Sequence, residues 1–188
     1  MDLPALHACR QSRGFTLTEL IVVIAIIAVL SAVLIPAWNR SRGTAHATEC
    51  MGRLRQIGAG LIRYLGDHDQ TFPTLAMARE SKDQKLPTID TELLPYVPDP
   101  KVFACPADTK QLFEKTGTSY LWNHKLNGQK LGALSVTFVK ANTIEEQSRI
   151  MVIGDKEGWH PYLKSKLNVL YADGHTSQEL TFVEEEAQ

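Results

Sequence analysis

Residues 13–20 read Arg-Gly-Phe-Thr-Leu-Thr-Glu-Leu, and residues 21–30 continue them as Ile-Val-Val-Ile-Ala-Ile-Ile-Ala-Val-Leu. From Phe15 to Ile35 the chain holds 21 residues, and its polar ones are Thr16, Thr18, Glu19 and Ser31. With a rise of about 1.5 Å per residue, a helix of this length extends about 31 Å, which is enough to cross the hydrocarbon core of a bilayer. The pattern predicts a transmembrane helix that carries one carboxylate near its start.

The residues around the apolar run distinguish it from an ordinary export signal. An ordinary secretory signal has a shorter apolar core, and its small-residue cleavage site follows that core. Arg10 and Arg13 precede the run here, and this positive charge places the N-terminal side in the cytoplasm. A lone carboxylate such as Glu19 is costly inside a membrane segment and is normally functional. An uncleaved single-pass anchor is the alternative interpretation.

This arrangement resembles the N-terminus of type IV prepilins and type II secretion pseudopilins. The resemblance implies that a prepilin peptidase cuts between Gly14 and Phe15 and methylates the new N-terminus, so that Glu19 becomes the fifth residue of the mature chain. We expect the Glu19 carboxylate to pair with the free amine of Phe15 on a neighbouring subunit, which sets the axial register of packed helices. The alternative is an unpaired Glu19 that reaches the lipid head groups.

Composition limits the possible partners and the redox state. The net charge of -1 gives no reason to expect nucleic acid as a partner. Removal of the leader would remove Cys9, leaving Cys50 and Cys105 as a pair outside the cytoplasm. A bridge between them would close a loop of about 55 residues and stabilise the domain by about 4 kcal/mol. Two separate thiols are the alternative.

The helix is expected to continue beyond the membrane. Apolar residues recur at spacings of three or four along Ala47, Met51, Leu54, Ile57, Leu61 and Leu65, which is typical of a helix packed on a core. We predict one helix over residues 15–65, ended by Gly66-Asp67 and bent at Pro36. The expected organisation is a leader at 1–14, a membrane and assembly helix at 15–36, the amphipathic half of that helix at 37–66, and an extracytoplasmic domain at 67–188.

The remaining sequence predicts a small antiparallel sheet. Residues 67–118 are rich in proline and read as irregular, with one short helix over residues 91–96. Strand patterns cover residues 134–139, 149–153, 167–172 and 176–183; Gly154-Asp155 is expected to end the second, and Asp173-Gly174 to turn between the last two. The fold class that follows is α+β and pilin-like, with a long N-terminal helix packed on an antiparallel sheet.

Four further segments carry a narrower resemblance. Residues 49–58, 102–108, 119–123 and 168–175 resemble elements of a group of prepilin-like proteins that is abundant in planctomycete and verrucomicrobial bacteria. The last segment contains the group's closing Asp-Gly-His hairpin. In this group, nine residues usually separate a His from the Asp-Gly pair. Here twelve residues separate His160 from Asp173, so the usual spacing is not met.

Metal binding and catalysis receive little support from the sequence. Asp155, His160, Asp173 and His175 lie near predicted strand ends and could converge on a metal. Their oxygen donors would suit calcium, which major secretion pseudopilins bind, but these residues do not match that calcium site residue by residue. The favoured interpretation places Asp at turns and His on the surface, with no metal bound. Without a nucleophile motif or a phosphate-binding glycine loop, we expect no enzyme activity and no cofactor.

These observations predict a structural subunit of a type II secretion pseudopilus or a type IV pilus-like filament. Its expected partners are the prepilin peptidase, other pilin or pseudopilin subunits, and the secretion or pilus assembly machinery. We expect a single pass through the bacterial inner membrane, with the C-terminal domain in the periplasm or on an extracellular filament. One alternative is a membrane-anchored extracytoplasmic binding domain that uses the signal only for export. An anchored metal-dependent enzyme is a second alternative.

Overall fold

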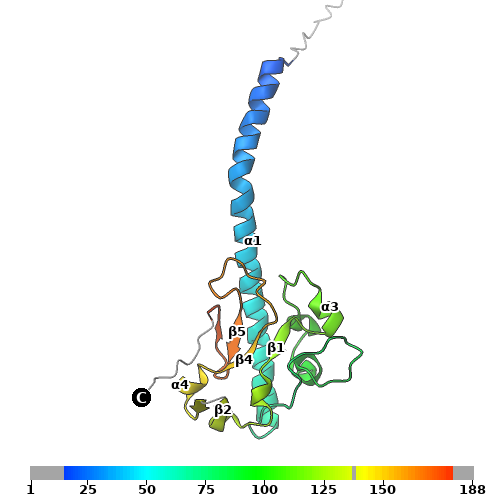
Figure 1. Cartoon of the computed structure of the whole chain (residues 1–188), viewed down its shortest axis with the longest axis vertical. Coiled ribbons are helices and arrows are strands. Elements are labelled where there is room, and N and C mark those ends of the chain that lie inside the picture. Colours follow the sequence, from blue (N-terminus) through cyan, green and yellow to red (C-terminus); the bar gives the residue numbers. More distant parts are fainter. Residues whose placement is uncertain (1–14, 137–138, 180–188) are drawn as a thin grey trace, which may run out of the picture. The chain divides into compact units, whose positions relative to one another are not determined.

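The computed structural model describes residues 15–136 and 139–179. Contacts divide the chain into two units, Met1–Asn39 and Arg40–Gln188, and the long first helix runs through the boundary (Figure 1). The α-helices are α1 (Leu17–Asp67), α2 (Ile89–Glu92), α3 (Leu112–Thr116) and α4 (Ile144–Gln147). The 3-10 helices are η1 (Leu94–Tyr96), η2 (Pro100–Phe103), η3 (His124–Leu126) and η4 (Leu131–Ala133).

The described residues contain six short strands, which form two antiparallel sheets. They are β1 (Tyr120–Trp122), β2 (Leu134–Val136), β3 (Val139–Ala141), β4 (Met151–Asp155), β5 (Val169–Tyr171) and β6 (Thr176–Ser177). The larger sheet has the order β1-β4-β5-β6, and β2 pairs with β3 separately. The predicted α+β class, with a long helix packed on an antiparallel sheet, is confirmed.

The second half of α1 supplies one side of the core of the Arg40–Gln188 unit. The predicted stripe is buried at Ala47, Leu54, Ile57, Leu61 and Leu65, whereas Met51 is only half-buried and Cys50 is buried beside it. A Cβ placed on Gly58 would lie 2.9 Å from a methyl group of Leu170, so glycine there allows α1 to approach β5 closely (Figure 1).

Strand β4 lies inside the sheet and is buried from Val152 to Asp155. The expectation that Gly154-Asp155 would end this strand is wrong. The two residues continue it because they pair with Leu121 and Tyr120 of β1, a strand that the sequence analysis did not predict. This pairing buries Asp155 inside the domain, whereas a residue in the expected turn would be exposed to water.

Other boundaries also differ from the prediction. Residues 134–139 do not form one strand, because Leu134–Val136 and Val139–Ala141 pair with each other; residues 137–138 lie outside the described part. The predicted strand over 176–183 is described only up to residue 179 and is regular only over Thr176–Ser177. The region read as irregular contains α2, η1, η2 and α3. Gly174, at a φ of +89°, occupies the expected turn before β6.

Candidate functional site

Helix α1 begins at Leu17. Hydrogen bonds between Thr16, which precedes the helix, and Glu19, in its first turn, stabilise this end. Thr16 donates from its backbone N to Glu19 Oε2 at 2.9 Å and from its hydroxyl to the same oxygen at 2.8 Å. Glu19 N donates in return to Thr16 Oγ1 at 3.2 Å. These reciprocal bonds form a capping box, which satisfies backbone donors that the first helical turn leaves without partners.

Glu19 therefore has a role within its own chain that the sequence analysis missed. The Thr-x-x-Glu spacing of residues 16–19 is the signal that could have revealed it. The predicted pairing of Glu19 with the amine of another subunit is a separate role, and it stays a prediction. Phe15 is exposed in the structure, and Gly14 lies outside the described residues.

The apolar half of α1 has no core of its own. By length and composition, α1 is the one described helix that could cross a membrane, and none of its most apolar 18-residue window is buried. Four consecutive residues, Ile21 to Ile24, are each between 45% and 56% exposed. Because consecutive helical residues point about 100° apart, the apolar surface surrounds the helix. This surface requires lipid or other apolar helices around it.

Pro36 lies inside the continuous helix, and the predicted bend there stays a prediction.

Residues 9–35 match the model of the prokaryotic N-terminal methylation motif. The chain carries a prepilin-type N-terminal signal. The match spans the predicted junction between Gly14 and Phe15 and includes Glu19. Together with the single long apolar helix, the prepilin-type signal fits a membrane-anchored, single-pass protein. No curated protein and no solved structure matches the chain. The narrower resemblance of residues 49–175 stays a prediction.

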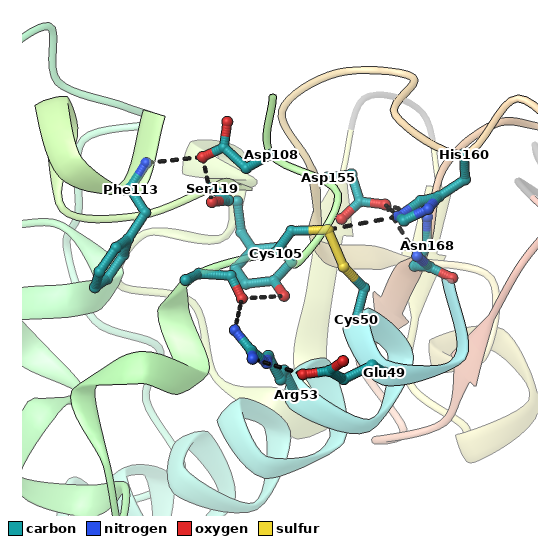
Figure 2. Close-up of a disulfide and its surroundings, with 12 residues drawn as sticks. Glu49, Cys50, Arg53, Cys105, Asp108, Phe113, Ser119, Asp155, His160 and Asn168 are labelled. Carbon is teal, nitrogen blue, oxygen red and sulfur yellow. Dashed lines mark hydrogen bonds and ion pairs between the residues drawn. A yellow bond between two sulfur atoms is a disulfide. The ribbon is translucent and has the colours of Figure 1, made fainter. Parts of the chain in front are cut away.

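A disulfide joins Cys50 of α1 to Cys105, which follows η2 (Figure 2). Their Cα atoms lie 5.3 Å apart, and both residues are buried. The predicted bridge is therefore present, and it fastens α1 to the irregular segment of the domain. Arg53, one turn after Cys50, reinforces the connection by donating to the carbonyl oxygen of Ala104 at 2.7 Å.

The bridge is expected to contribute strongly to stability. Because 55 residues separate the two cysteines, Cys105→Ser should lower the free energy of unfolding by about 4 kcal/mol. Thermal unfolding of the full chain in detergent, with a metal chelator present, measures the change. A dithiol reductant should lower the melting temperature of the wild type to that of the variant and leave the variant unchanged. Cys9→Ser is the matched control and should behave as the wild type; a variant as stable as the wild type would contradict the expectation.

Two of the four suggested metal ligands lie beside the disulfide. Asp155, at the end of β4, and His160, in the loop that follows, are both buried, and His160 Nε2 lies 3.3 Å from Asp155 Oδ2 and 3.6 Å from Cys105 Sγ (Figure 2). Asp173 and His175 do not join them in the described structure. Their side chains bond each other at 2.6 Å at the turn before β6. The four residues therefore do not converge on one site; Asp173 and His175 occupy the expected turn, whereas Asp155 and His160 are buried.

Neighbouring polar groups hold Asp155 and the segment of Cys105 in position. Asn168 donates to Asp155 Oδ2 from its backbone N at 2.6 Å and from its side-chain amide at 3.2 Å. Burial, and to a lesser extent the charge of Asp155, raises the pKa of Tyr120. The Tyr120 hydroxyl therefore stays protonated and donates to Ala104 O at 3.4 Å.

Proposed function

We propose that this chain is a structural pilin-like subunit of a type II secretion pseudopilus or a type IV pilus-like filament. The observation that carries the proposal is the apolar half of α1, which lies within the prepilin-type signal at residues 9–35 and has none of its most apolar 18-residue window buried. Lipid covers this surface before assembly, and the equivalent helices of neighbouring subunits cover it in the filament. In this proposal the chain is a substrate of the prepilin peptidase and is not itself an enzyme.

The apolar half of α1 is separate from the core of the domain, and this separation supports the proposal. Among the described residues, the buried core of the domain begins at Ala47 and includes no side chain from the apolar half of α1. That half is therefore free to serve assembly without any cost to the fold of the domain. The domain itself is proposed to lie in the periplasm or on the filament surface, outside the inner membrane.

A second candidate function has one observation in its favour. The domain has an apolar hollow of about 300 Å³ between α1 and the β5–β6 turn. Its lining includes Ile62 and Ile144, which are 60% and 75% exposed. A membrane-anchored binding domain would use such a hollow for a ligand, and it would use the signal only for export and anchoring.

Photo-cross-linking in membranes separates the two proposals. A photoreactive residue at Val29, which is 68% exposed in the apolar half of α1, should cross-link to a second subunit of pilin-like mass. The same residue at Lys85, an exposed position on the domain, is the matched control for random collision. Cross-links from Val29 to lipid alone would support the anchored binding domain and contradict the filament subunit.

A further inference from the structure

The surroundings of the disulfide contain more ligand chemistry than a structural bridge requires. Cys50, Cys105, Asp155 and His160 each offer one ligand atom, and these atoms all lie within 4.8 Å of one another. The four residues come from α1, the segment after η2, β4 and the loop after β4. All four are at least 96% buried. Two thiolates, an imidazole and a carboxylate form a donor set that proteins use for zinc.

The distances agree with tetrahedral coordination. Zinc binds sulfur at about 2.3 Å and nitrogen or oxygen at about 2.0–2.2 Å, so tetrahedral angles separate S from N by about 3.6 Å and N from O by about 3.4 Å. The structure places Cys105 Sγ 3.6 Å and Asp155 Oδ2 3.3 Å from His160 Nε2. Two edges of the tetrahedron are therefore already formed. The sulfur atoms, bonded to each other here, would have to separate to about 3.8 Å after reduction.

Buried polar atoms without partners provide an independent indication. Among the described residues, none forms a hydrogen bond with Asp155 Oδ1 or His160 Nδ1, although both atoms are fully buried. Leaving such groups unpaired is costly, and a cation bound to the Asp155 carboxylate would offset this cost for Oδ1, whereas His160 Nδ1 is not a ligand of an ion bound at Nε2. Asn168 donates to Asp155 Oδ2, the carboxylate oxygen that lies nearest to His160 Nε2, and so fixes its orientation, which is how second-layer residues support metal ligands.

The local charge also suits a metal. Zinc with two thiolates and one carboxylate has a net charge of about -1. The guanidinium of Arg53 donates to the carbonyl oxygen of Ala104, the residue next to Cys105, and so brings a positive charge to this side of the cluster. Calcium prefers six to eight oxygen ligands and does not fit this set.

We propose that Cys50, Cys105, Asp155 and His160 bind zinc when the disulfide is reduced, so that oxidation and metal binding exclude each other. A dithiol supplies two electrons and two protons to the disulfide, which gives two thiols and leaves the dithiol as a cyclic disulfide. Zinc then displaces both thiol protons to solvent, and no electrons move in this step. The metal keeps α1 fastened to the segment after η2 in a chain that has no disulfide.

Cobalt binding to the full chain tests the proposal. The chain is purified in detergent with Cys9→Ser, so that Cys50 and Cys105 are its only cysteines. After dithiol reduction and removal of the reductant under anaerobic conditions, one equivalent of Co²⁺ should give the visible bands of tetrahedral cobalt and a thiolate charge-transfer band. Zn²⁺ should abolish both, and the oxidised chain should show neither. A reduced chain without the charge-transfer band would overturn the proposal.

Variants assign the two ligands that are not cysteines. His160→Gln and Asp155→Asn should each weaken cobalt binding by about tenfold or more. His175→Gln, at the partly exposed turn before β6, is the matched control and should bind as the parent chain does. Parent-like binding by both His160→Gln and Asp155→Asn would overturn the assignment.

Melting temperatures keep the proposal testable if a variant does not fold. Zn²⁺ should raise the melting temperature of the reduced parent chain and leave the oxidised chain unchanged, because a ligand that binds only the folded reduced state stabilises only that state. Equal shifts in both states, or no shift in the reduced state, would overturn the proposal.

Discussion

Glu19→Gln is expected to lower the recovery of the chain in a sheared filament fraction by about tenfold or more, because in the proposed filament it removes one charge of the pair that Glu19 forms with the amine of a neighbouring subunit. The glutamine keeps the size of the side chain, and its amide oxygen can still accept from Thr16 N, so the capping box survives. Export, processing and folding of the Arg40–Gln188 unit should be unchanged. Filament recovery and the cross-linking yield from Val29 measure the loss.

The capping role of Glu19 needs a control of its own. Thr16→Val removes the hydroxyl that bonds Glu19 in both directions and retains the charge of Glu19. A lost cap costs about 1 kcal/mol and affects only the first turn of α1. We therefore expect Thr16→Val to assemble nearly as the wild type does. Equal filament recovery for Glu19→Gln and the wild type would count against the pairing of subunits through this carboxylate.

The elements that the sequence predicted well are those specified by local patterns. The apolar run and the spacing of the stripe from Ala47 to Leu65 lie within one helix, where periodicity along the chain determines which side chains are buried. The ends of α1 were predicted to within two residues for the same reason: Gly66 and Asp67 interrupt the apolar pattern where the helix ends.

The elements that the sequence did not reveal depend on contacts between distant segments. Strand β1 has only three residues and is defined by its pairing with β4, more than thirty positions later, so no local pattern marks it. The burial of Asp155 follows from that pairing. His160 lies beside the disulfide because the loop after β4 brings it to Cys105. The number of residues between His160 and Asp173 does not predict this contact. The turn-forming residue types in this segment predicted exposed positions, but tertiary packing buries Asp155 and His160.

Gly14→Val is expected to abolish production of the chain that begins at Phe15. Gly14 lies outside the described residues, and the prepilin-type signal includes the junction that follows it. The peptidase must reach the backbone between the two residues, and a β-branched side chain obstructs an approach that glycine leaves open. Mass spectrometry of the membrane-extracted protein should find only the precursor, longer by the 14 residues of the leader.

Ser12→Val is the matched control, because it adds the same side chain two residues before Gly14 and should leave cleavage intact. The wild type should begin at an N-methylated Phe15; a wild-type chain that still begins at Met1 in cells with active peptidase would contradict the assigned junction. The uncleaved variant also tests the role of Glu19. Its Phe15 nitrogen remains a neutral amide, so Glu19 keeps its charge and lacks the amine that would pair with it. Gly14→Val should therefore be anchored in the membrane and be absent from filaments, as expected if the amine and the carboxylate are two halves of one contact between subunits.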